Sequence, residues 1–158
     1  MITLKQLKWS NCFSYGSDNE LLLNENTVTQ IIGTNGMGKS SIPLIIEEVL
    51  YNKNSKGIKK ADIPNRYIND GYTIFLSFEK DNNEYSISVN RKSNIKVVLT
   101  KNGEDISSHT ATNTYKSIQE IVGFVTPLKS CPFAVTVPAT IRLPELSPFI
   151  QVVVVEPS

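Results

Sequence analysis

Apolar and polar residues alternate at the start of the chain, which is the period of a strand with one buried face. The apolar members of this first run are Ile2, Leu4, Leu7 and Trp9. A second short run, 20–23, is suited to be its antiparallel partner. The segment 28–32 is rich in β-branched residues and leads directly into Gly33, as a buried strand followed by a tight loop would. Three strands are therefore predicted before residue 34.

The apolar spacing changes to the helical period after residue 41. Apolar side chains then recur at i, i+3, i+4, i+7 and i+8: Ile42, Ile45, Ile46, Val49 and Leu50. This stripe predicts a helix packed on a sheet. Pro43 lies in the first turn, where a missing N–H group removes no intrahelical bond, so we expect the helix to tolerate it.

An antiparallel insert is predicted after this helix. The connecting segment, 52–66, is polar and has no clear period, so we expect a long surface loop. Alternation returns in 72–78 and in 85–89, on either side of a turn at 81–83, and this pattern predicts a β-hairpin. A further strand, 95–99, follows.

The pattern after residue 100 predicts one more turn and one more helix. Asn102-Gly103 is a strong signal for a tight turn, and Ile106 is expected to start the return. Residues 112–122 regain the helical period. Caps are available at Thr112 or Asn113 before this helix and at Gly123 after it.

Length and composition exclude several function classes. A chain of 158 residues is long enough for one domain, and its net charge of +1 gives no global field for binding nucleic acid. Cys12 and Cys131 are too few for a disulfide framework. The sequence shows no signal region and no membrane-spanning run. We expect a protein of a reducing cytoplasm, that of the host cell if a phage encodes it, with no membrane partner.

The composition changes at about Phe124. Six of the eight prolines lie beyond this point: Pro127, Pro132, Pro138, Pro144, Pro148 and Pro157. Closely spaced prolines prevent a continuous helix or a central strand, so only Val152–Val155 is strand-like. We expect 1–124 to form an α/β unit and 125–158 to be an atypical, Pro-rich tail, disordered or frameshifted.

One segment, Gly33-Thr34-Asn35-Gly36-Met37-Gly38-Lys39-Ser40-Ser41, fits the phosphate-binding pattern G-x-x-x-x-G-K-[ST]. Its glycines allow consecutive N–H groups to converge, and the following helix adds its partly positive N-terminus. The predicted strand before the loop and the predicted helix after it supply the context that this motif requires. The pattern predicts that the protein binds ATP or GTP.

Individual residues of the loop have separate predicted roles. Lys39 would bridge the β- and γ-phosphates, and the Ser40 hydroxyl would help to hold Mg²⁺. The predicted cofactor-binding set is Gly33, Asn35, Gly36, Met37, Gly38, Lys39, Ser40 and Ser41, with Ser40 also binding the metal. No residue of this chain is predicted to be catalytic.

Residues 1–124 together resemble the N-terminal ATPase lobe of the SMC-like DNA double-strand-break repair ATPases, most closely the ATPase subunit of bacteriophage recombination exonucleases. The loop 33–41 is similar to the family's G-x-N-G-x-G-K-S-S, and 4–13 resembles its opening strand with an Asn-x-Phe-like element. The segments 47–51, 62–66, 75–79 and 85–87 follow the family's order of helix, loop and strands.

The resemblance implies a P-loop NTPase head of ABC type that uses ATP and Mg²⁺. Two such heads would form a homodimer that encloses two ATP molecules and gates DNA for a separate nuclease subunit. By position, Asn35 would lie beside the γ-phosphate, and Ser41 would reach the α-phosphate.

The chain also departs from the family. A glutamine-bearing loop, a long heptad coiled coil, a signature motif and an acidic catalytic strand would follow Gly123, and none of them is recognisable. We hypothesise that the tail is a frameshifted or foreign ending. This chain alone is then expected to bind nucleotide poorly and to hydrolyse it hardly at all.

Two other function classes stay open. The chain could be a small stand-alone P-loop enzyme such as a kinase, or a non-catalytic nucleotide-binding fragment. Kinases of this size use mostly parallel sheets, which the antiparallel insert does not suit.

Other chemistry-bearing residues have simpler interpretations. A basic cluster, Lys53, Lys56, Lys59, Lys60 and Arg66, fits either DNA phosphate contacts or a solvated loop. Arg91, Lys92 and Lys96 are interpreted as exposed turn charges, and His109 as a loop residue. Trp9, Phe13 and Tyr72 are predicted to pack in the core rather than to stack on bases, and Cys12 to be buried.

Overall fold

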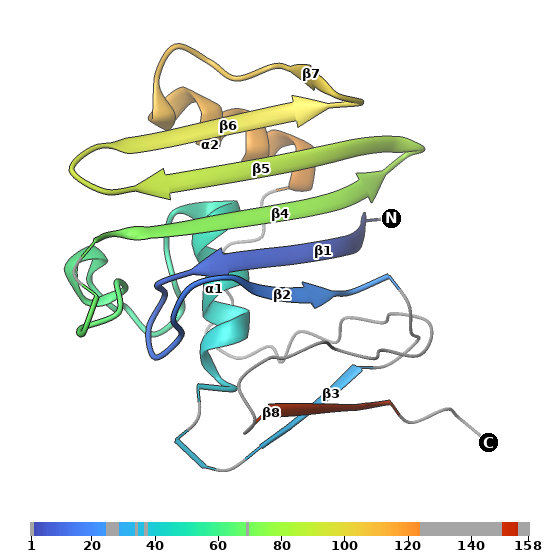
Figure 1. Cartoon of the computed structure of the whole chain (residues 1–158). Coiled ribbons are helices and arrows are strands. Elements are labelled where there is room, and N and C mark those ends of the chain that lie inside the picture. The colour runs from blue at the N-terminus through green and yellow to red at the C-terminus, as the bar shows by residue number, and fades with distance from the viewer. Residues whose placement is uncertain are drawn as a thin grey trace.

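The computed structural model describes residues 2–24, 29–33, 35–36, 38–68, 70–123 and 150–154. Within these ranges six strands form one sheet, two α-helices cover one of its faces, and two further strands form a separate ribbon (Figure 1).

The large sheet is antiparallel throughout. Its strands are β1 (Ile2–Ser10), β2 (Asn19–Leu22), β4 (Tyr72–Lys80), β5 (Asn83–Arg91), β6 (Ile95–Lys101) and β7 (Glu104–Asp105). They lie in the order β2-β1-β4-β5-β6-β7. Each of these strands except β7 coincides closely with a run predicted from alternation, and the return after Asn102-Gly103 begins at Glu104. The hairpin β4–β5 forms the centre of this antiparallel sheet, and β1 pairs with β4.

The pairing of β1 with β4 explains the imperfect alternation of the first strand. The register changes between Leu4 and Gln6, so the two buried side chains Leu4 and Leu7 lie three positions apart. Lys5, at this irregularity, forms ion pairs with Glu79 at 3.1 Å and with Glu84 at 3.6 Å.

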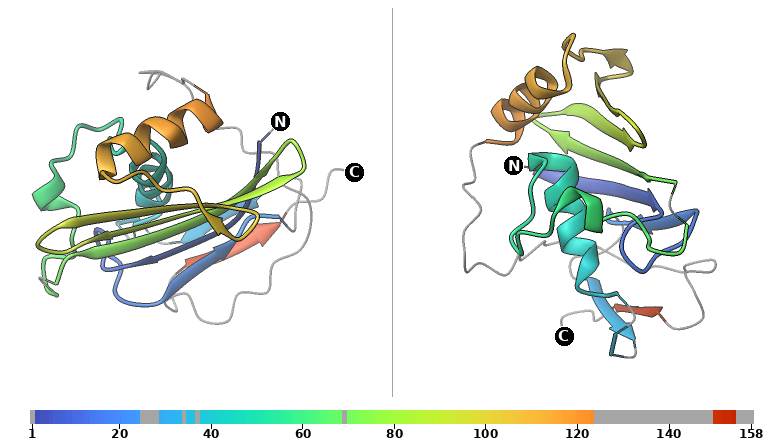
Figure 2. Two further views of the ribbon diagram at one scale, coloured as in Figure 1. Left: turned by 90° about the horizontal axis from the view of Figure 1, so that it is seen from above. Right: turned by 90° about the vertical axis from the view of Figure 1, so that its left-hand side faces the viewer.

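Both helices lie on the same face of the sheet, as the view from above shows (Figure 2). They are α1 (Ser41–Tyr51) and α2 (Ala111–Val122). The sheet turns aligned rows of buried side chains toward them, for example Leu7, Leu76, Ile87 and Leu99, which are paired across four neighbouring strands. Ile45 and Val49 of α1 and Ile118 of α2 are fully buried in the same cluster. The hydrophobic core thus lies between the helices and the sheet.

The cap of α2 differs from the prediction. Thr110 is the N-cap, and its hydroxyl oxygen accepts a hydrogen bond from the Asn113 N–H. The assignment of Thr112 or Asn113 as N-cap was wrong because Thr110 already has the extended backbone of a capping residue. Gly123 ends the helix with φ +92°, as predicted.

The strand that leads into the glycine loop belongs to the smaller ribbon. β3 (Thr29–Gly33) pairs antiparallel with β8 (Ile150–Val154). The ribbon lies beyond the start of α1 (Figure 1). Of the Pro-rich tail, the structure describes only β8, so the predicted domain boundary at residue 124 stays a prediction.

Among the described residues, the core contains a buried charged cluster around Glu48. Glu48 of α1 is fully buried, and its carboxylate accepts hydrogen bonds from Lys60 Nζ and, at 2.9 Å, from Tyr72 Oη. Lys60 also donates to the Asn52 carbonyl at 2.7 Å, and Arg91 donates to the Asn52 side-chain oxygen at 3.0 Å. Burial lowers the pKa of Lys60, while its hydrogen bond to Glu48 acts in the opposite direction. The cluster fixes the carboxyl end of α1 to two strands and to the following loop.

The segment 52–66 is consequently more than the surface loop that was predicted. It contains a 3-10 helix, η1 (Lys60–Asp62), and the side chains of Ile63 and Asn65 beyond it are buried. The polarity of the segment concealed this role because its buried members are one asparagine and one isoleucine, and Lys60 is only partly buried.

We predict that Glu48→Gln destabilises the fold by about 2 kcal/mol. A neutral amide cannot match the charge of Lys60, and breaking a buried pair costs about 3–5 kcal/mol. The loss is smaller here because the Lys60 side chain is 35% exposed and regains water. Urea unfolding checks this value, with Glu120→Gln, an exposed site on α2, as the matched control. Equal stability of the two variants would contradict the role given to the cluster.

Candidate functional site

The glycine loop lies where its sequence predicts, between β3 and α1. Of the predicted binding residues the structure describes Gly33, Asn35, Gly36, Gly38, Lys39, Ser40 and Ser41. Met37, like Thr34, lies outside the described residues. The strand-loop-helix context that the motif requires is therefore present.

Two glycines of the loop have backbone conformations that other residues rarely adopt. Gly36 has φ +88° and Gly38 has φ +89°. A Cβ atom on Gly36 would meet nothing within 4 Å, so only the conformation selects glycine there. A Cβ atom on Gly38 would lie 2.4 Å from the Ser14 hydroxyl oxygen and 3.2 Å from a ring carbon of Tyr15. The conformation therefore selects glycine at position 38, while the Ser14 hydroxyl could rotate away from a side chain there.

The first turn of α1 begins directly after Gly38. The Ser41 N–H donates to the Gly38 carbonyl at 2.8 Å, and the Ile42 N–H donates to the Lys39 carbonyl at 3.3 Å. Ser40 is the N-cap residue, is exposed, and makes no side-chain cap hydrogen bond. Its hydroxyl is therefore not used to cap the helix. Helix N-termini of this kind attract anions through their N–H groups and their dipole.

The turn between β1 and β2 supports the loop from the side. Tyr15 Oη donates to the Gly38 carbonyl at 3.1 Å. The Tyr15 ring also meets the Trp9 ring edge to face, with centroids 5.2 Å apart and planes at 87°. Burial raises the pKa of Tyr15 to about 12, so its phenol remains a hydrogen-bond donor at neutral pH. This contact fixes the orientation of the peptide group that begins the turn into α1.

Tyr15 is in turn held by the segment after η1. Asn65 donates from its side chain to the Tyr15 carbonyl at 3.0 Å and from its backbone N–H to the Asn11 carbonyl at 2.8 Å. The Phe13 N–H donates to the Ile63 carbonyl at 2.6 Å, next to a bridge between Cys12 and Pro64. Three segments far apart in the sequence are therefore linked through the turn that contains Tyr15.

Sequence reasoning missed Tyr15 and Asn65. Tyr15 lies in no recognisable motif, and the segment 62–66 gives no role to Asn65. Their hydrogen bonds join residues 23 and 50 positions apart in the chain. Asn11 and Phe13 both have positive φ, which marks the turn as strained. These backbone angles are visible only in the structure.

The remaining predictions for single residues are mostly confirmed. Trp9, Cys12 and Tyr72 are buried in the core, and Phe13 packs partly against it. Burial raises the pKa of the Cys12 thiol, so it stays protonated and unreactive at neutral pH. His109 is exposed. Within the described ranges no group of three or more His, Cys, Asp or Glu side chains could hold a metal ion.

The basic residues divide into two groups. Lys53, Lys56, Lys59 and Arg66 are exposed, as a solvated loop or a phosphate contact requires, but Lys60 is bound to Glu48. Lys92 and Lys96 are exposed, as predicted. The interpretation of Arg91 as an exposed turn charge was wrong: its guanidinium donates to Asn52, and its Nε atom is buried.

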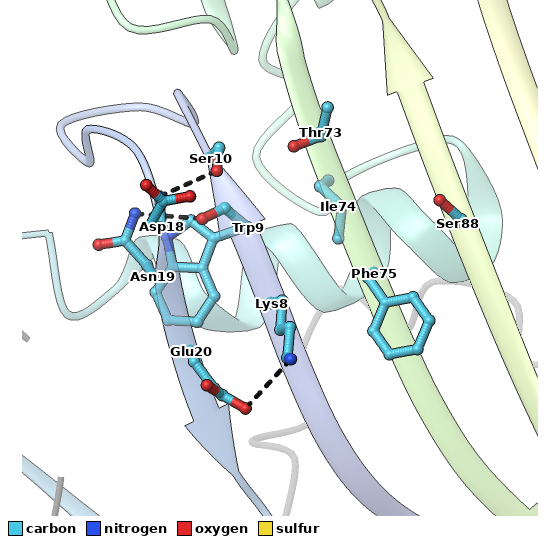
Figure 3. A pocket seen from close by; sticks show the side chains of 10 residues that line it. All are labelled: Lys8, Trp9, Ser10, Asp18, Asn19, Glu20, Thr73, Ile74, Phe75 and Ser88. Carbon is cyan, nitrogen blue, oxygen red and sulfur yellow. Dashed lines mark hydrogen bonds and ion pairs between the residues drawn. The ribbon is translucent and has the colours of Figure 1, made fainter. Parts of the chain in front are cut away.

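The sheet face opposite the helices carries a shallow hollow of about 390 Å³, seen in Figure 3. Phe75 and Ser88 line one side, and Lys8 and Glu20 line the other. Lys8 and Glu20 form an ion pair at 3.5 Å, so their charges neutralise each other. Asp18, which also lines the hollow, has no ion-pair partner among the described residues, so the charge left in the hollow is negative and does not suit a phosphate. No helix within the described residues is long and apolar enough to cross a membrane.

Comparison with known proteins gives two curated relatives, although no protein-family model matches. The chain is 52% identical over 127 residues to the probable exonuclease subunit 2 of Escherichia phage T5, which covers 77% of this chain and 20% of the relative. It is 36% identical over 100 residues to the DNA double-strand break repair Rad50 ATPase of Archaeoglobus fulgidus, which covers 63% of this chain and 11% of the relative. The chain thus spans a fifth or less of the length of these relatives.

Solved structures share the fold. A structure titled for ATP-driven dimerization and DNA stimulated activation of SMC ATPases matches with a TM-score of 0.57 at 19% identity, covering 76% of this chain and 77% of the other. The recombination mediator protein RecF with ATP matches with a TM-score of 0.52 at 20% identity. This match covers 68% of this chain and 29% of the RecF chain. The fold is therefore that of an ABC- or SMC-type P-loop ATPase head. By sequence and by fold together, this chain belongs to the SMC-like ATPase family, as an N-terminal lobe related to the phage exonuclease subunit.

Proposed function

We propose that this chain is the ATP-binding N-terminal portion of the ATPase subunit of a DNA recombination or repair nuclease complex. In this proposal residues 1–124 form the lobe, and the nucleotide phosphates bind at Gly33–Ser41. The observation that carries the proposal is the path of the chain from β3 through Gly36 and Gly38, both with positive φ, into the start of α1. This path, the G-x-x-x-x-G-K-[ST] spacing and the relatives all support the same site.

The described side chains fit a bound Mg²⁺-nucleotide. Ser40 is exposed and its hydroxyl makes no cap hydrogen bond, so it can serve as the single protein ligand that this motif offers to Mg²⁺. When bound, Mg²⁺ neutralises charge on the phosphates. Lys39 would add a positive charge to the phosphate oxygens, and Asn35 and Ser41 would contact the γ- and α-phosphates. The N–H groups of the loop would orient the chain of phosphates.

The partners of the complete subunit are part of the same proposal. The phage relative is named as an exonuclease subunit, and the archaeal relative as a double-strand break repair ATPase. We extend these roles to this chain: a nuclease subunit as partner, DNA as the substrate of the complex, and a second ATPase head as the other half of a homodimer.

The antiparallel sheet favours this function over a stand-alone P-loop kinase. All neighbouring strands of the six-stranded sheet are antiparallel among the described residues, whereas small kinases use mostly parallel sheets. A non-catalytic nucleotide-binding fragment would show the same site, and it is distinguished by hydrolysis rather than by binding.

Mg-ATP is predicted to stabilise the chain through Lys39. Mg-ATP at a free concentration of about 100 times its Kd adds about 2.7 kcal/mol to the free energy of unfolding. For a chain of this size, this raises Tm by several degrees. Lys39→Ala should abolish most of this rise because it removes the charge that faces the phosphates. Thermal unfolding with and without Mg-ATP measures the rise in Tm for the unmodified chain and for Lys39→Ala. Lys116→Ala, at an exposed position of α2, is the control. A rise that survives Lys39→Ala in full would locate the nucleotide elsewhere.

Tyr15→Phe is predicted to weaken Mg-ATP binding about fivefold. The phenylalanine ring keeps the contact with Trp9, but the hydrogen bond to the Gly38 carbonyl is lost, and such a bond contributes about 1 kcal/mol. Isothermal titration gives the affinity, and Tyr67→Phe is the control because Tyr67 is 97% exposed. If both variants bind as the unmodified chain does, Tyr15 has no part in orienting the loop.

A further inference from the structure

A second concave region lies at the other end of α1 from the glycine loop. It encloses about 550 Å³ between η1, the segment 64–66, the residues just before β4 and the turn between β5 and β6. In Figure 1 these segments meet at one end of the large sheet. Lys60 and Arg91, which line the region, contact Asn52 after the last turn of α1. A helix of 11 residues is about 16 Å long, so this region is separate from the candidate nucleotide site.

The wall of the region is built by close backbone contact. Gly71 has φ +71°, and a Cβ atom there would lie 2.1 Å from the Arg91 carbonyl oxygen. The chain before β4 therefore packs directly against the end of β5. Lys92 and Asp70 join the same two segments across the rim through an ion pair of 2.8 Å. The two segments form a fixed frame around the hollow.

Positive charge exceeds negative charge in the lining. Four basic side chains, Lys60, Arg66, Arg91 and Lys92, face two acidic ones, Asp62 and Asp70. Lys60 is neutralised by Glu48 and Lys92 by Asp70. Neither Arg66 nor Arg91 has a carboxylate partner within the described part of the chain. Two guanidinium groups, opposed only by Asp62, thus remain to attract an anion.

Arg91 has guanidinium donors that the described residues do not all satisfy. Its Nε atom is buried and has no hydrogen-bond acceptor among the described residues, while Nη2 donates to Asn52. Buried donors in native proteins almost always have a partner, so one without an acceptor requires an explanation. Nε is closed off from solvent, so an oxyanion in the hollow would accept from the outer edge of the guanidinium instead.

We propose that this hollow is a binding site for a phosphate group, separate from the nucleotide phosphates at Gly33–Ser41, with Arg91 as its inner anchor and Arg66 as its outer cation. The two guanidinium groups and Asp62 together leave one net positive charge, which attracts an anion. Guanidinium groups also bind tetrahedral oxyanions through paired, parallel hydrogen bonds. The phosphate can be free or part of a nucleic acid, since both present the same oxygens.

The test uses the full chain carrying Lys39→Ala, so that phosphate binding at the glycine loop does not contribute. Inorganic phosphate is titrated at constant ionic strength, and the backbone amide resonances of Gly71, Ser93 and Asn94, which line the hollow, are followed by NMR. Saturable shifts at these amides are expected. Acetate should bind at least tenfold more weakly.

Two variants locate the anion. Arg66→Gln and Arg91→Gln should each weaken phosphate binding about tenfold, whereas Lys116→Gln, with the same loss of charge on α2, should not change it. Arg66 is exposed, so its replacement does not endanger folding even if Arg91→Gln does. Shifts that fail to saturate, equal binding of acetate, or equal weakening by Lys116→Gln would each overturn the proposal.

The source of the phosphate is resolved by competition. A short single-stranded oligonucleotide that displaces inorganic phosphate from these amides identifies a nucleic-acid phosphate as the ligand. An oligonucleotide that leaves the phosphate-induced shifts unchanged identifies free phosphate. A phosphate titration that shows no binding in the hollow does not count against the proposed nucleotide site, because that site is tested separately through Lys39.

Discussion

The antiparallel pairing of β1 with β4 is the contact on which the other features depend. It joins the first strand of the chain to a hairpin more than sixty positions later. It also completes the apolar face of the sheet on which α1 and α2 pack. It also brings the turn after β1 beside the glycine loop, where Tyr15 meets Gly38. Without this pairing the loop would lose its lateral support, although its own sequence would be unchanged.

The two ends of α1 are held by different chemistry. At its start, the fit is conformational and directional: Gly38 has a positive φ, and its carbonyl accepts from Tyr15. At its end, the fit is electrostatic: the buried carboxylate of Glu48 attracts Lys60 and Tyr72. The segment 60–65 connects the two ends because Lys60 binds Glu48 while Asn65 binds the Tyr15 carbonyl. A displacement of α1 at one end is therefore opposed by the contacts of the segment 60–65 at the other end.

The sequence predicts the local elements well because their apolar periods are strong. The glycine loop, the helix after Ser40 and the strands of 72–78 and 85–89 all lie where the pattern indicates. The contacts of Glu48, Lys60 and Arg91 are not predictable in this way, because charged residues in polar segments usually face solvent and here they do not. Tyr15 and Asn65 escape prediction for a related reason: their partners are defined by strand pairing rather than by neighbours in the sequence. The motif thus indicates which residues would touch a nucleotide, and only the fold reveals which residues hold the motif in place.

Native-state hydrogen exchange of the chain with and without saturating Mg-ATP tests the central claim most directly, that the glycine loop and the turn after β1 form one nucleotide-binding unit. The account predicts slower amide exchange after binding in two separate segments, 36–42 and 11–16, with the Asn65 amide protected alongside them. Exchange in β5 and β6 should not change. Protection confined to 36–42, with no effect at 11–16, would show that Tyr15 and its neighbours are not part of the site, and protection at neither segment would contradict nucleotide binding at the loop.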